Sequence, residues 1–169
     1  NGRGGRRLND LTVKGRVSTL DLLNMLLRFV IGPVAFGGDL KQFYPSIALD
    51  ESQWNLQRVL WRENMDFKAE LEEIVIVSLI FGVRAVSALS ERAVIELAEH
   101  VKEKLPRLAE CLTKSRFVND LLDSSMNLKT AKEIMDAAYD LFESVGMGCK
   151  GWSISGSDLH PDVTKDGLS

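Results

Sequence analysis

The chain has 169 residues and a formal net charge of −3, with 45% hydrophobic and 27% charged residues. Its length fits one domain or a large piece of one, and its apolar fraction is sufficient for a core. The lack of a net basic charge argues against a free-standing nucleic-acid-binding protein, because such proteins are usually basic. No signal peptide or bilayer-spanning apolar stretch is recognisable. We therefore expect an intracellular protein, cytoplasmic or nuclear, without a membrane partner and with Cys111 and Cys149 as reduced thiols.

Basic residues gather near the beginning of the chain, at Arg3, Arg6, Arg7, Lys14 and Arg16. This cluster could meet a phosphate backbone, although a solvated terminus is the simpler interpretation. The chain begins without Met and stops after Gly167-Leu168-Ser169 without closing an element. We expect both ends to be disordered cuts through a longer polyprotein.

The first third of the chain predicts a helix and then a strand. The helix is expected to begin at a Ser18 or Thr19 cap and to end at Gly32-Pro33. Apolar residues repeat along it with a helical period and predict a face that packs in the core: Leu20, Leu23, Leu27 and Val30, with Leu22 and Leu26 beside them. Residues 34–38 predict a short buried strand that leads into Asp39, after which Pro45 stops any regular element.

The middle of the chain predicts two more strands and a long helix. Residues 56–61 could form a strand, and residues 74–80 are rich in β-branched side chains that favour one. From about Ala85 the period becomes helical, and Pro106 is expected to end or kink this helix. Leu89, Val94, Leu97, Val101 and Leu105 form its expected buried positions.

The last third predicts a hairpin, a helix and a final strand. Residues 116–123 read as a β-hairpin with Asn119-Asp120 at its tip, and residues 107–115 lead into it. Asn127 and Thr130 precede an amphipathic helix that ends at Gly146, and residues 149–154 predict a strand. The order of elements favours an α+β fold, a mainly antiparallel sheet with helices packed on one face.

Two acidic residues in these elements suggest a chemistry. Asp39 ends one predicted strand and Asp120 lies at the hairpin tip. If the two strands are neighbours, both carboxylates meet at one edge, where they could hold Mg²⁺, with Mn²⁺ as the alternative. A pair of such ions can activate a nucleophilic oxygen and neutralise a leaving pyrophosphate. An acidic residue at a strand end is also a common helix cap, so spacing alone leaves this open.

Six short motifs in order make the chain resemble the reverse transcriptases of BEL/Pao-class LTR retrotransposons, over about residues 8–154. The first is Leu8-Asn9-Asp10 ahead of a Leu-rich helix that ends in Leu27-Arg28-Phe29. The others are Phe36-Gly37-Gly38-Asp39, Leu60-Trp61-Arg62, Ile80-Phe81-Gly82-Val83, Arg116 to Leu122, and Gly148 to Ser153. The resemblance implies a partial domain over residues 1–169, with a palm-like antiparallel sheet packed on helices and partial fingers. It also implies that the remaining fingers, the thumb and the ribonuclease H region of the polyprotein are missing.

The resemblance further implies the roles of individual residues in an RNA-directed DNA polymerase, a nucleotidyltransferase. Asp39, Asn119 and Asp120 would hold the catalytic positions, with Asp39 and Asp120 as metal ligands. Three residues would contact the nucleotide: Tyr44, Phe81 and Gly82. The partners would be an RNA or DNA template-primer and a dNTP.

The chain departs from the family pattern at Asn119, where the family has its first hairpin aspartate. A neutral side chain with one carbonyl oxygen cannot replace a carboxylate that bridges two ions. We therefore expect weakened metal binding and a catalytically defective copy, also because Arg84 to Ser87 depart from the family's small polar residues and Pro. The alternative is a domesticated, non-enzymatic module that binds nucleic acid or protein.

Overall fold

The computed structural model describes residues 5–15 and 22–155. Its helices are α1 (Leu8–Leu11), α2 (Leu22–Ile31), α3 (Val86–Val101), α4 (Pro106–Lys114) and α5 (Leu128–Ser144), with short 3₁₀ turns η1 (Glu51–Leu56) and η2 (Glu63–Met65). Its strands are β1 (Val34–Leu40), β2 (Arg58–Trp61), β3 (Glu72–Val75), β4 (Arg116–Phe117), β5 (Asp120–Ser125) and β6 (Cys149–Ile154). The expected cap at Ser18 or Thr19, Leu20, part of the basic cluster and the expected disorder after residue 155 lie outside the described residues.

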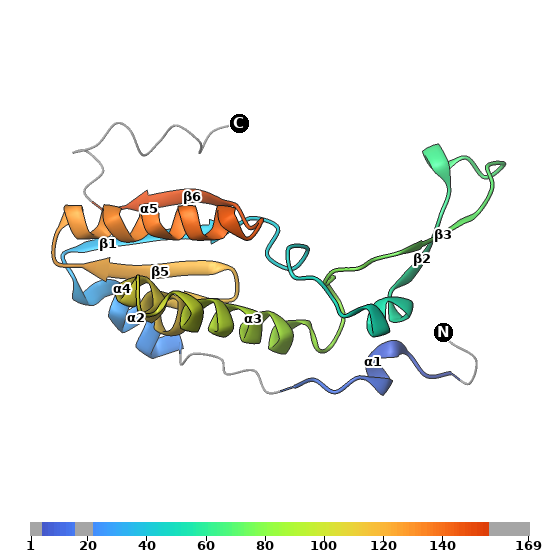
Figure 1. The fold of residues 1–169 in the computed structure, drawn as a ribbon, viewed down its shortest axis with the longest axis horizontal. Coiled ribbons are helices and arrows are strands. Elements are labelled where there is room, and N and C mark those ends of the chain that lie inside the picture. The colour runs from blue at the N-terminus through green and yellow to red at the C-terminus, as the bar shows by residue number, and fades with distance from the viewer. Residues whose placement is uncertain (1–4, 16–21, 156–169) are drawn as a thin grey trace.

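The sheet is antiparallel, in the order β4-β5-β1-β6, so the α+β class and the antiparallel sheet on helices are confirmed. Successive side chains of a strand point to opposite faces. On one face, Phe36 and Leu121 pack with residues of α3, α4 and α5 into the main core. In Figure 1, α5 runs along the strands next to β6, and α3 and α4 lie below it in this view.

Helix α2 does not pack as its periodicity predicts. Its contacts are mainly with β5, and Met25 is its one buried residue among those described. Leu23, Leu27 and Val30 are exposed, so the expected core face is wrong. Phe29 of α2 lines a hollow on the sheet face opposite the main core, so helices cover both faces and not one. Hydrophobic periodicity finds the helix, but it cannot tell whether a partner covers each stripe.

Helices α3 and α4 are separate, and Pro106 begins the second instead of ending the first. Proline suits the first position of a helix, because its missing N–H would have no intrahelical partner there. The segment 107–115, expected only to lead into the hairpin, is therefore mostly helix. Along α3 the buried residues are Val86, Ser90, Val94, Ala98 and Val101. The predicted Leu89 is exposed.

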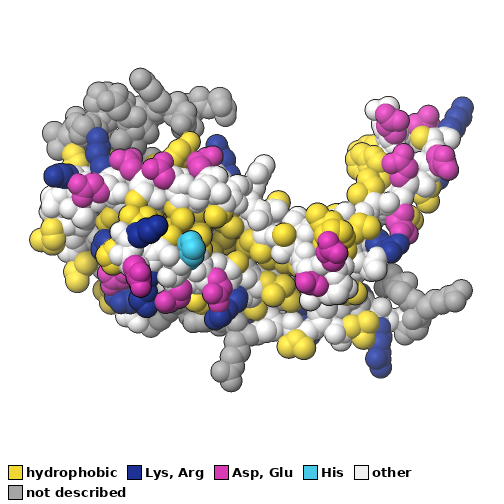
Figure 2. All heavy atoms as spheres, viewed as in Figure 1, with side chains coloured by type: hydrophobic (Ala, Val, Ile, Leu, Met, Phe, Trp, Pro, Cys, Tyr) yellow, Lys and Arg dark blue, Asp and Glu magenta, His cyan; other side chains and the backbone are white. Residues whose placement is uncertain are grey.

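Strands β2 and β3 form a separate hairpin that projects from the body (Figure 1). The strand expected over residues 74–80 begins earlier, at Glu72, and ends at Val75. The amide of Gln57 donates to the carbonyls of Ile76 and Ser78, so residues after Val75 tie the arm to its base instead of extending the ladder. All of β2 is exposed, and Figure 2 shows hydrophobic side chains beside charged ones on this arm.

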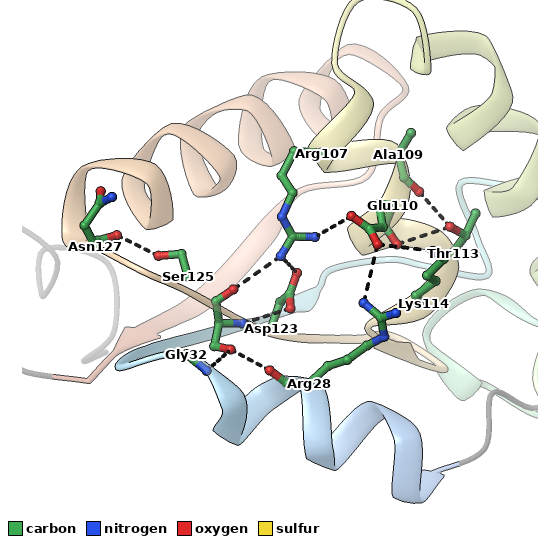
Figure 3. Close-up of polar contacts among 11 residues, drawn as sticks. Arg28, Gly32, Arg107, Ala109, Glu110, Thr113, Lys114, Asp123, Ser125 and Asn127 are labelled. Carbon is green, nitrogen blue, oxygen red and sulfur yellow. Dashed lines mark hydrogen bonds and ion pairs between the residues drawn. The ribbon is translucent and has the colours of Figure 1, made fainter.

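Strand β5 is fixed at its far end by a polar cluster at Asp123 (Figure 3). Asp123 is 2% exposed, and Arg107 of α4 lies 2.7 Å from its Oδ2 atom. Arg107 also pairs with Glu110, which in turn pairs with Arg28 of α2. The cluster thus joins α2, α4 and β5, and it holds the strand that carries Asp120 at its other end.

Helix α5 and strand β6 follow the sequence prediction closely. The Asn127 side chain caps α5 by accepting a hydrogen bond from the N–H of Thr130 at 2.9 Å. The chain turns after α5 at Gly146, whose φ of 76° is readily adopted by glycine. Strand β6 spans Cys149–Ile154, as expected. Within the part of the chain that the structure describes, no helix has the length and apolar character needed to cross a membrane.

Candidate functional site

Asp39 and Asp120 face each other on neighbouring strands, because the register of β1 with β5 makes them direct partners. The N–H of Leu40 donates to the carbonyl of Asn119 at 2.9 Å, so the next pair along the ladder, 39 with 120, is one without its own backbone hydrogen bonds. Side chains of such a pair stand close, with Cβ atoms about 4.5–5.5 Å apart. The sheet therefore brings together two carboxylates from distant parts of the sequence.

The hairpin turns at Val118 and Asn119, one residue earlier than expected. Asp120 is already in β5 and pairs with Phe117 of β4. Asn-Asp is a typical turn pair, whereas Val118 has a φ of 56° that β-branched residues rarely adopt. The buried guanidinium of Arg116 donates to the Val118 carbonyl and pairs with Glu91 of α3, which fixes the turn.

Both carboxylate oxygens of Asp39 are held by donors of the chain itself. The amide Nδ2 of Asn119 donates to Oδ1 of Asp39. The Nζ atom of Lys150 lies 2.8 Å from Oδ2 of Asp39, since β6 pairs Lys150 directly opposite. An aspartate at position 119 could not donate in this way while ionised, because a carboxylate is only an acceptor.

The negative charge of Asp120, the second carboxylate, is less well balanced by nearby donors and cations. Burial, and then the negative charge of Asp39, raise the pKa of Asp120 above its ordinary value, and Lys150 acts in the opposite direction. The site thus contains two carboxylates and one ammonium group, with Asn119 contributing a neutral donor.

Asp39 and Asp120 border an open hollow of about 390 Å³ on the sheet face opposite the main core. The hollow lies between the carboxylates and Phe29 of α2, where the sheet carries only small side chains that leave the space open. These small lining residues are Ala35, Gly37, Gly151 and Ser153. A Cβ at Gly37 would lie 2.7 Å from the Leu122 side chain, so the backbone here approaches its neighbour more closely than other residues allow. The hollow could take a ligand beside the carboxylates.

A pair of divalent ions does not fit the side chains as they lie. Such ions need hard oxygen ligands, and Asp39 already gives both oxygens to Asn119 and Lys150. Across residues 5–15 and 22–155, no group of three or more His, Cys, Asp or Glu side chains could hold a metal ion. The two aspartates could share one ion only if Lys150 moved away.

Tyr44, Phe81 and Gly82 form a second group. The rings of Tyr44 and Phe81 meet edge to face, with centroids 4.8 Å apart and planes at 84°. Phe81 is 77% exposed, and a Cβ at Gly82 would enter open space. Phe43 contacts Tyr44 on one side and lies 5.8 Å from the Arg116 guanidinium on the other, which connects this group to the hairpin.

Sequence reasoning missed two residues that shape the site, Lys150 and Arg116. Lys150 has no local signal beyond its motif, because its place opposite Asp39 depends on a strand register that the local pattern does not reveal. Arg116 follows no periodic pattern, although a basic residue at the base of a hairpin can serve the turn carbonyls.

No protein-family model matches the chain, and no curated protein matches it. The assignment of a function therefore depends on the geometry of this site and on the resemblance of its motifs.

Proposed function

We propose that the chain is the palm, with part of the fingers, of a BEL/Pao-class reverse transcriptase whose nucleotidyl-transfer site is disabled. The observation that carries the proposal is the register that makes Asp39 and Asp120 direct partners. Two carboxylates beside an open hollow are what phosphoryl-transfer chemistry with Mg²⁺ or Mn²⁺ needs. The resemblance independently assigns these same residues to the catalytic positions.

The second group also supports the proposal. Tyr44 and Phe81 present an aromatic surface, and Phe81 and Gly82 leave space beside it. An exposed aromatic ring can stack against a sugar or a base. The proposed partners are an RNA or DNA template-primer and a dNTP, within the cell, with the fingers, thumb and ribonuclease H region supplied by the rest of a polyprotein.

Asn119 is the proposed cause of the defect. Its amide donates a hydrogen bond to one oxygen of Asp39. An aspartate at position 119 would add a third carboxylate to the site, and cations would then be needed to neutralise the three negative charges. The loss of a charged ligand removes several kcal/mol of transition-state stabilisation, and each 1.4 kcal/mol is about tenfold in rate. We therefore expect at least about a hundredfold lower rate than in a sequence with aspartate here.

Primer extension on an RNA template with Mg²⁺ tests this. Residues 8–154 replace the matching segment of an active relative, so that fingers and thumb are present, and the graft is compared with its Asn119→Asp variant. Activity in Asn119→Asp alone would support the proposal. The matched control is Asn127→Asp, which adds the same charge at the α5 cap, where aspartate also serves well.

Equal activity of the unmodified graft and Asn119→Asp would show that Asn119 does not disable the site. A folded graft that stays silent with Asn119→Asp and also after the opposing ammonium group is removed by Lys150→Met would contradict the polymerase assignment itself. Asp39→Asn in the Asn119→Asp background should abolish the restored activity, because the cross-strand pair is then lost.

A further inference from the structure

We infer that Lys150 is the resident counter-cation of the Asp39–Asp120 pair, and that its ammonium group weakens the binding of a divalent cation there. The inference rests on the proposed function, which supplies the reason to expect a divalent ion at this pair. It goes beyond it by assigning a second obstacle to metal binding, separate from Asn119.

Lys150 reaches Asp39 because β6 contains an extra residue. The pairing with β1 joins Lys150 to Asp39, but beyond this point Gly38 alone stands opposite Gly151 and Trp152. Gly151 has a φ of 60°, the left-handed conformation found in bulges of this type. In a regular ladder position 151 would stand opposite Asp39, and Lys150 would point to the other face of the sheet. The bulge therefore places the ammonium group on the face that carries both carboxylates.

The ammonium group competes directly for a metal ligand. Nζ of Lys150 lies 2.8 Å from Oδ2 of Asp39, an oxygen that an ion shared with Asp120 would need. A divalent ion bound between the two carboxylates would lie within a few ångströms of a positive charge, and like charges at this distance repel. Binding thus requires displacement of Lys150.

The exposure of the pair sets the size of the effect. The Lys150 side chain is 53% exposed and that of Asp39 is 26% exposed, so solvent screens the interaction and the lysine can move out. The barrier to metal binding is therefore moderate. We expect removal of the ammonium group to tighten divalent-ion binding on the order of tenfold.

Mn²⁺ binding to the full chain, followed by the loss of the free-ion electron paramagnetic resonance signal, tests the inference. Lys150→Met keeps the length of the side chain without its charge and should gain about tenfold in affinity over the wild type. Lys150→Arg keeps the charge and should match the wild type. Asp39→Asn added to Lys150→Met should remove the gain, because one of the two carboxylates is lost.

Two results would overturn the inference. One is equal Mn²⁺ affinity of the wild type, Lys150→Met and a second neutral variant, Lys150→Gln. Another is a gain that persists after Asp39→Asn. Circular dichroism checks that the variants fold, which is expected because the Lys150 side chain is half exposed on an edge strand.

This test and the primer-extension test can fail separately. A gain in Mn²⁺ affinity with a folded graft that stays silent even with both Asn119→Asp and Lys150→Met would keep this inference and refute the proposed function. If Asn119→Asp restores primer extension but Lys150→Met leaves the Mn²⁺ affinity unchanged, the proposed function stands and this inference is refuted.

Discussion

Replacing Arg107 by Met is expected to destabilise the fold, because it leaves Asp123 buried without its counter-charge. Asp123 is 2% exposed, with Arg107 at 2.7 Å from Oδ2 and the N–H of Ser124 at 2.9 Å from Oδ1. Removing one partner of a buried ion pair typically costs about 3–5 kcal/mol. The Arg107 side chain is 38% exposed, so solvent screens its charge, and we expect a loss of about 2–3 kcal/mol in the free energy of unfolding.

Urea unfolding followed by circular dichroism measures this loss. The matched control is Arg92→Met on α3, which removes the same group from an exposed pair with Glu96 and should change stability by less than about 0.5 kcal/mol. Asp123→Asn combined with Arg107→Met should recover part of the loss. A neutral amide needs no counter-charge, and its carbonyl oxygen can still accept from Ser124.

The reasoning would be refuted if Arg107→Met cost no more than Arg92→Met. Asp123 would then be stable in the core without Arg107, and the cluster in Figure 3 would not be what holds α4 against β5.

Two further predictions follow from titratable groups. The raised pKa of Asp120 means that the folded state binds its proton more tightly than the unfolded state does, so its ionisation destabilises the fold as pH rises from 3.8 through the folded pKa. Asp120→Asn should therefore have a higher urea midpoint than the wild type at pH 7 and lose this advantage below pH 3.8; equal midpoints at pH 7 would contradict the assignment. Burial raises the pKa of Cys149 to about 12, and burial and then Asp123 raise that of Cys111 well above its ordinary value. Mass spectrometry should detect alkylation by iodoacetamide at pH 8 at both thiols in urea and at neither in the native chain, whereas rapid native labelling of Cys149 would contradict its buried place in β6.

Features with strong local signals could be predicted from the sequence. The cap at Asn127 and the glycine at position 146 delimit α5, because both act through the backbone of adjacent residues. Strand β6 was found with its correct bounds. The sequence predicts that Asp39 and Asp120 meet if their strands are neighbours, and the register of β1 with β5 shows that the strands are neighbours.

The predictions were wrong where the same residue type is compatible with two different local structures. Pro106 can stop a helix or begin one, and only the packing of α4 on the core decides between them. Val118 adopts a positive φ that is unfavourable for a β-branched residue, and a hydrogen bond from the Arg116 guanidinium to its carbonyl stabilises this conformation. The prediction from the Asn-Asp pair therefore placed the turn one residue too late. The exposed leucines of α2 show that amphipathic periodicity describes the helix and not its surroundings.

The position of Lys150 lies beyond any local rule. It depends on a bulge in β6, and the bulge is visible only when β6 is set against β1. Gly151 is a weak signal for such a bulge, since glycine in a strand also has other causes.

The strand order has a consequence for how the chain acquires its structure. The central strand β1 is the first of the sheet to be synthesised, yet its partners β5 and β6 follow some eighty residues or more later. Until β5 has left the ribosome, the hydrogen-bonding groups on both edges of β1 have no sheet partner, while α2 and the β2–β3 arm can already form from local contacts. Closing such long loops delays folding, and topologies with many distant contacts fold slowly. The cross-strand pairing that unites Asp39 with Asp120 is therefore also the step for which the nascent chain must wait.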